Sequence, residues 1–147
     1  MSSSSFLNLV SEVGLLLGIP ALSPGNDDVC QLAFDNRHLL QIVYVRARNQ
    51  ILLSCPVGPS KITAEQALLA ASNNFMQAAG GAVACATPDG RLVLQVGMSE
   101  KFCQASTLVS TIESLLDQVE AWEVKLTRMT YSQERFEPAK PNRMMMA

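Results

Sequence analysis

Apolar residues recur at intervals of three and four positions in three stretches of the chain, which predicts three amphipathic helices. The first is expected over Ser4–Leu17, and Gly18 ends it. The second begins at the capping box Thr63-Ala64-Glu65-Gln66 and ends before Gly80. The third is expected from about Ser99 to Tyr131, where the apolar stripe gives way to polar sequence.

Five shorter apolar runs, each bounded by turn residues, predict β-strands. Short connections between neighbouring runs, including the Asp89-Gly90 step, favour antiparallel hairpins. The predicted order is α-β-β-β-α-β-β-α, an α+β domain with a twisted antiparallel sheet and three helices over residues 1–131. Residues 132–147 are polar, contain two prolines and are expected to form a flexible C-terminal tail. The predicted strands are Val29–Asp35, Leu39–Arg46, Gln50–Cys55, Ala82–Ala86 and Arg91–Val96.

The predicted strands carry more apolar residues than a sheet with one solvated face needs. Apolar side chains occupy both faces of the strand that begins at Leu39 and of the strand that begins at Gln50. The first and third helices are expected to cover one face of the sheet, and the second helix part of the other. Two interpretations stay open: the three helices suffice, or apolar surface remains for another polypeptide.

The composition excludes several classes of protein. Hydrophobic residues make up 48% of the chain and charged residues 16%, which is too apolar for a disordered chain. The apolar runs are too short to cross a bilayer, and the formal charge of −2 comes without a basic patch, so neither a membrane nor nucleic acid is an expected partner. Residues 1–5 lack the positive charge of a secretory signal, which predicts a cytoplasmic protein.

Few residues are suited to catalysis or to metal binding. The four cysteines, Cys30, Cys55, Cys85 and Cys103, form no C-x-x-C pair and are expected to be reduced, mostly buried thiols. The single histidine, His38, lies beside a predicted hairpin turn, whereas a zinc site needs three or four converging ligands. The sequence therefore predicts no catalytic residue, metal ion or cofactor. A small enzyme that pairs one of the thiols with His38 is the alternative that spacing leaves open.

Several segments together carry a family likeness, although each is loose by itself. The first helix ends in Leu15-Leu16-Leu17-Gly18-Ile19-Pro20, and Cys30-Gln31-Leu32-Ala33-Phe34-Asp35-Asn36 leads into an apolar strand. The run Asp89-Gly90-Arg91-Leu92-Val93-Leu94 follows an alanine-rich helix, and Trp122 lies near the end of the long last helix. In this order, over about residues 6–126, the chain resembles class I type III secretion chaperones of the Tir-chaperone (CesT-like) family. The polar tail with its methionine-rich end departs from the family pattern.

The resemblance implies a non-enzymatic bacterial protein that binds the N-terminal segment of a cognate secreted effector, keeps it soluble and partly unfolded, and delivers it for export. Its implied partners are the effector, a second copy of the chain and the secretion ATPase. The candidate effector-binding residues are Leu9, Val13, Leu16, Leu32, Phe34, Ile42 and Tyr44. The candidate dimer-interface residues are Leu68, Ala71, Phe75, Val83 and Cys85. A roadblock-like or YbjN-like dimeric regulatory scaffold is the alternative function.

Overall fold

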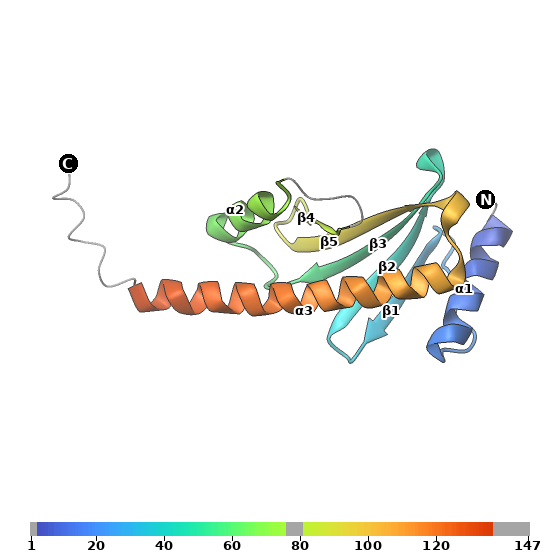
Figure 1. Ribbon diagram of the computed structural model, residues 1–147, viewed down its shortest axis with the longest axis horizontal. Helices are drawn as coiled ribbons and strands as arrows, with labels where there is room; N and C mark the ends of the chain where they lie inside the picture. Colours follow the sequence, from blue (N-terminus) through green and yellow to red (C-terminus); the bar gives the residue numbers. More distant parts are fainter. Residues whose placement is uncertain (1–2, 76–80, 137–147) are drawn as a thin grey trace.

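The chain forms one antiparallel sheet with helices packed against it, as a computed structural model shows for residues 3–75 and 81–136 (Figure 1). The sheet has five strands over these residues, in the order β1-β2-β3-β5-β4. This confirms the predicted fold class and the order α-β-β-β-α-β-β-α. The elements are α1 (Ser3–Leu17), β1 (Val29–Phe34), β2 (His38–Val45), β3 (Gln50–Val57), α2 (Ala64–Asn73), β4 (Val83–Ala86), β5 (Leu92–Ser99) and α3 (Ala105–Phe136).

The predicted capping box starts α2 as expected, because Thr63 and Gln66 exchange two hydrogen bonds. The Gln66 backbone N–H donates to Thr63 Oγ1 at 3.2 Å, and the Thr63 N–H donates to Gln66 Oε1 at 2.9 Å. The helix ends earlier than predicted, at Asn73. The side chain of its C-terminal capping residue, Asn74, bonds to β4. The predicted last turn, residues 76–80, lies outside the described residues.

Strand β3 continues through Pro56 to Val57, two residues beyond its predicted end at Cys55. The ladder between β2 and β3 ends at the pair of Gln41 and Ser54, so β2 has no partner group for Pro56. Pro56 still pairs with Val93 of β5. A proline is tolerated at such a position because no neighbouring strand needs its missing N–H.

The last helix begins and ends later than predicted. A 3-10 turn, Glu100–Phe102, separates β5 from α3, which starts at Ala105. The helix continues to Phe136, so the first residues of the predicted tail are helical, and residues 137–147 lie outside the described residues. The apolar stripe of α3 faces the sheet as predicted, with Leu108, Ile112, Leu115, Val119, Trp122 and Leu126 all buried.

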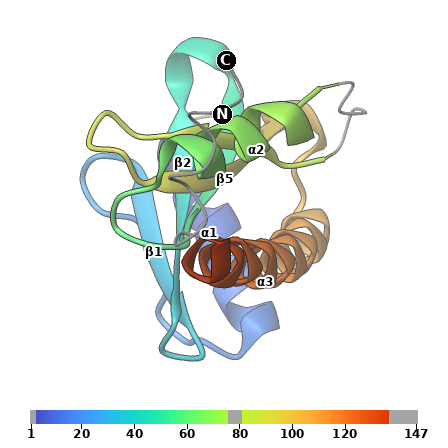
Figure 2. The same ribbon diagram turned by 90° about the vertical axis from the view of Figure 1, so that its left-hand side faces the viewer.

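Helices α1 and α3 lie on the same side of the sheet and contact each other (Figure 2). Phe6, Val10 and Val13 of α1 are completely buried against this side. The end of β3 fixes α3: the Gly58 N–H donates to Glu123 Oε1 at 3.2 Å, and a Cβ added to Gly58 would lie 2.5 Å from Leu126 Cδ1. The core is therefore a two-layer arrangement that uses one face of the strands.

Candidate protein-binding surfaces

The two faces of the sheet differ in cover. On the face toward α1 and α3, here called the covered face, alternate strand residues such as Leu40, Ile42, Ile51 and Leu53 are completely buried. Most of the intervening residues are half-buried or exposed in the described chain, and these are here called the open face; Val93 of β5 points to the same side but is buried. The open face consists of Val29, Gln31, Ala33, Leu39, Gln41, Val43, Val45, Gln50, Leu52, Ser54, Gln95 and Gly97.

The open face carries no charged residue. Its register places Gln31, Gln41, Ser54 and Gln95 side by side in a polar row that crosses four strands. A parallel apolar row, formed by Val29, Val43 and Leu52, lies two residues further along the strands. Exposed sheet faces of soluble proteins are commonly charged or polar, so an uncharged face with half-exposed valines and leucines is suited to contact with another polypeptide.

The outer edge of β1 adjoins the open face and has unpaired backbone groups. Tyr44 donates its N–H to the Asp28 carbonyl at 3.0 Å, which sets the phase of the β1–β2 ladder. In that phase the N–H and C=O groups of Gln31 and Ala33 point away from β2, and they have no hydrogen-bond partner in the described structure. The Val29 carbonyl is occupied by the Gly25 N–H at 2.8 Å. An extended chain can therefore pair with β1 at Gln31 and Ala33.

Most of the predicted effector-binding residues lie in the core. Leu9, Val13, Leu32, Ile42 and Tyr44 are buried on or beneath the covered face, and Phe34 is partly buried. Only Leu16 is largely exposed, together with its neighbour Leu15. The strand residues chosen from the sequence have the phase of the covered face, because both phases are apolar and sequence alone does not say which one the helices take.

The predicted self-association residues do reach the surface. Leu68 and Ala71 are exposed on α2, and Phe75 is exposed just beyond its end; Leu68 is 68% exposed and Phe75 80%. Val83 of β4 is also exposed, and Cys85 is partly buried. Helix α2 packs beside β4 at the edge of the sheet opposite to β1. We call Leu68, Ala71, Phe75 and Val83 the α2–β4 patch.

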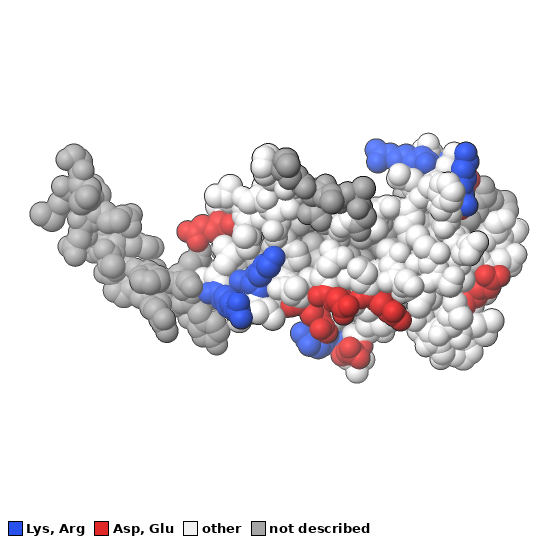
Figure 3. Space-filling model, in the orientation of Figure 1, with Lys and Arg blue, Asp and Glu red and all other residues white. Residues whose placement is uncertain are grey.

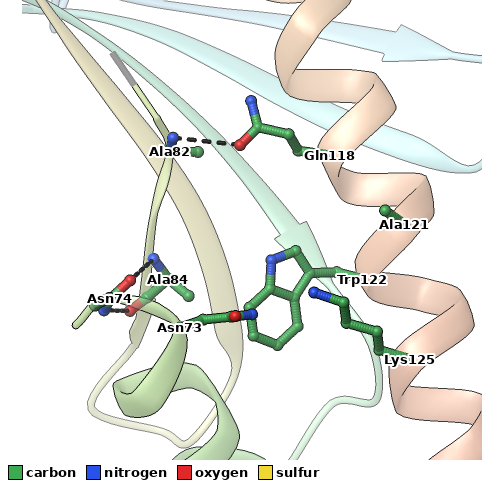
Figure 4. A pocket seen from close by; sticks show the side chains of 8 residues that line it. All are labelled: Asn73, Asn74, Ala82, Ala84, Gln118, Ala121, Trp122 and Lys125. Carbon is green, nitrogen blue, oxygen red and sulfur yellow. Dashed lines mark hydrogen bonds between the residues drawn. The ribbon is translucent and has the colours of Figure 1, made fainter. Parts of the chain in front are cut away.

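The edge of β4 is occupied by side chains, a feature that the sequence did not indicate. The Asn74 side-chain amide donates to the Ala84 carbonyl at 2.7 Å and accepts from the Ala84 N–H at 3.0 Å (Figure 4). The Ala82 N–H donates to Gln118 Oε1 at 3.3 Å. A pocket of about 200 Å³ lies between α2, β4 and α3, with the Trp122 ring beneath Lys125.

The acidic side chains of α3 lie on the other side of the sheet from the open face. Acidic residues cluster along α3 in Figure 3. Glu113, Asp117 and Glu120 are exposed there. These carboxylates form the solvated side of an amphipathic helix.

The cysteines and the histidine do not form a reactive group. Burial raises the pKa of the Cys55 and Cys103 thiols to about 11, and nearby Glu123 adds to the effect at Cys55. Burial also raises the pKa of Cys30 and Cys85. His38 is buried opposite Phe34, and its Nε2 has no hydrogen-bond partner. Within the described residues, no three His, Cys, Asp or Glu side chains are placed to hold a metal ion, and no helix is long and apolar enough to cross a bilayer.

Comparison with known proteins decides the family. The model of the Tir chaperone protein (CesT) family matches residues 8–123, most of the chain. The chain belongs to the CesT family. The family is one of chaperones and not of enzymes, and the type III secretion chaperone predicted from the sequence is confirmed. A search of curated proteins finds no match.

Solved structures agree with this CesT-family fold. The ExsC–ExsE complex matches with a TM-score of 0.76 and 21% identity, covering 84% of this chain and 95% of that one. The HopA1–SchA chaperone–effector complex matches with a TM-score of 0.70 and 20% identity, over 84% and 98% of the two chains. The Yersinia pestis type III secretion chaperone SycH, in complex with a fragment of YscM2, matches with a TM-score of 0.64 and 14% identity, over 80% and 98%.

Proposed function

We propose that this chaperone binds the N-terminal segment of its effector in extended form, along the outer edge of β1 and over the open face. The observation that carries this proposal is the uncharged, half-apolar open face beside unpaired backbone groups of Gln31 and Ala33. Solved relatives of similar fold are complexes of a chaperone with an effector or a second protein, which supports a polypeptide ligand.

The β1 edge favours an unfolded segment over a folded partner. A backbone edge pairs only with another exposed backbone, and the chain of a folded protein rarely offers one. The segment loses about 2–5 kcal/mol on becoming ordered, and burial of apolar surface offsets this at roughly 25 cal/mol per Å². The same argument disfavours the roadblock-like or YbjN-like scaffold, which would hold a folded partner.

The chaperone needs no chemistry of its own for this role. Holding a segment against the sheet requires neither bond cleavage nor nucleotide hydrolysis, and the buried thiols with raised pKa values suit an inert protein. We place its action in the bacterial cytoplasm, before export, with release of the effector at the secretion ATPase.

A second copy of the chain is the proposed partner of the α2–β4 patch. Leu68 and Phe75 are large, apolar and more than two-thirds exposed, which is costly for an isolated chain in water. A spacing of three residues places Leu68 and Ala71 on one side of α2, and Phe75 is exposed two residues beyond the end of the helix, so the patch can pair with itself about a two-fold axis.

Strand addition is tested with a proline in β1. Gln31→Pro removes an N–H that points away from β2, so the β1–β2 ladder survives while one hydrogen bond to the effector is lost. Gln31→Thr is the matched control, since it keeps the N–H. Calorimetry with effectors encoded near this gene should show affinity reduced about tenfold or more by Gln31→Pro only. Equal affinities for the two variants, or a bound segment that protects no β1 amide from hydrogen exchange, would exclude binding at this edge.

A further inference from the structure

The two edges of the sheet differ in the backbone groups that are free to pair with an incoming strand. At β1 the outward backbone groups of Gln31 and Ala33 are unpaired, whereas at β4 the outward groups of Ala84 are both bonded to Asn74. The outward N–H of Ala82 is bonded to Gln118. Strand β4 is only four residues long, and within it the outward groups of Ala84 are occupied, whereas those of Ala86 have no hydrogen-bond partner in the described structure.

The Asn74 side chain does at Ala84 what a neighbouring strand would do. A carboxamide presents one donor and one acceptor with the geometry of a peptide group, and here it satisfies both backbone groups of one residue, at 2.7 and 3.0 Å (Figure 4). An incoming strand would first have to displace both bonds. Open sheet edges are sites of unwanted pairing, and occupying their backbone groups is a way to close them.

Both amides are held in place by other contacts. Asn74 is the C-terminal cap of α2, and its backbone N–H donates to the carbonyls of Ala70 and Ser72. The Gln118 Nε2 group donates to the backbone carbonyl and the hydroxyl of Ser114, both at 3.3 Å, which leaves Oε1 for Ala82. The amides are therefore prearranged, and little additional side-chain order is needed to bind β4.

We infer that Asn74 and Gln118, here called the amide caps, close the β4 edge to strand addition at Ala82 and Ala84. Strand-type pairing is thereby favoured at β1, and a second copy that approaches the α2–β4 patch meets the Asn74 side chain at Ala84 and not a free backbone. The first consequence rests on the proposed function, since it concerns the effector segment. The closure itself does not, and it can be tested on the chaperone alone.

Hydrogen exchange at single amides, followed by NMR, measures the closure directly. In the unaltered chain the Ala84 amide should exchange at least about tenfold more slowly than the outward amides of Gln31 and Ala33. Asn74→Ala should remove this protection. Asn74→Asp should retain part of it, because the carboxylate still accepts from the Ala84 N–H but donates nothing to the carbonyl. Asn73→Ala is the matched control, since Asn73 makes no hydrogen bond to β4 in the described structure.

Light scattering then tests whether a β4 edge without the amide caps pairs with a strand of another copy of the chain. The variant Asn74→Ala/Gln118→Ala should form assemblies of higher mass than the unaltered chain, increasingly so with concentration, with the Ala84 amide protected again inside them. Unchanged exchange at the amides of β2 and β3 shows that each variant is folded. If the double variant does not fold, Asn74→Asp takes its place in the light-scattering experiment. Fast Ala84 exchange in the unaltered chain, or an opened edge without any increase in mass, overturns the inference. Neither result bears on whether effectors bind at β1.

Discussion

Within β2 the covered and open faces of this sheet carry equal shares of apolar residues, three of four positions each, yet only the covered side lies in the core. Ile42 and Val43 are neighbours in β2, and only Ile42 is buried completely beneath the helices. The covered face contributes stability, because its side chains leave water when the chain folds. In the proposed function the open face provides binding surface, because its side chains lose water only when a partner arrives. The comparison teaches that apolar content alone does not distinguish a core from an interface.

The largest expected effect is a difference in stability between the variants Ile42→Ala and Val43→Ala. Removing the completely buried Ile42 side chain should lower the free energy of unfolding by about 2–5 kcal/mol, because a cavity remains in the core. Val43→Ala shortens a half-exposed side chain and should lower the free energy of unfolding by less than about 1 kcal/mol. Urea denaturation of the two variants measures the difference. Similar losses at both positions would mean that the two faces are equally covered.

A second contrast concerns how α3 is held on the covered face. Gly58 and Gly18 both have positive φ, so Gly58→Ala and Gly18→Ala each incur backbone strain of about 1–2 kcal/mol. A Cβ at Gly58 would also lie 2.5 Å from the buried Leu126, whereas nothing lies within 4 Å at Gly18. Gly58→Ala should therefore destabilise by about 1 kcal/mol more. Thermal unfolding gives the comparison, and equal losses would show that Leu126 moves aside freely.

On the open face, a charge should impair binding but not folding. Val43→Asp should weaken effector affinity about tenfold or more, because the bound segment would bury an unpaired carboxylate. Effector affinity of the unaltered chaperone should change little between about 0.05 and 0.5 M NaCl, since the open face carries no charge to be screened. Calorimetry at several salt concentrations checks both statements. A steep dependence of affinity on salt concentration would instead indicate that the effector binds at the acidic side of α3.

Near neutral pH, titration of the buried thiols should have the smallest effect on the free energy of unfolding. The folded-state pKa of Cys55 and of Cys103 is raised from 9.0 to about 11, so their contribution to stability is intact below pH 9. It is lost as the pH rises from 9 to about 11, because the unfolded chain loses these protons first. Alkylation by iodoacetamide at pH 8 should accordingly be slow in the folded chain and fast in urea. Rapid alkylation of a single thiol in the folded chain would reopen the hypothesis of a small enzyme.

The element types and their order could be read from the sequence, because each depends on local patterns. The stripe from Leu108 to Leu126 determined which side of α3 is buried, since that helix has one apolar side only. Thr63 and Gln66 determined where α2 begins, since a capping box needs only residues of one turn. Family membership followed from the same ordered pattern, and not from any single motif.

Tertiary structure alone decided which face of the strands became the core. In β2 both phases are apolar, and a shift by one residue exchanges Ile42 for Val43, so local pattern cannot rank them. The place where α2 ends and the closure of the β4 edge were equally hidden, because Asn74 finds Ala84 only after the chain has brought α2 beside β4. Local periodicity encodes which side chains avoid water, but which surfaces meet depends on contacts between residues distant in the sequence.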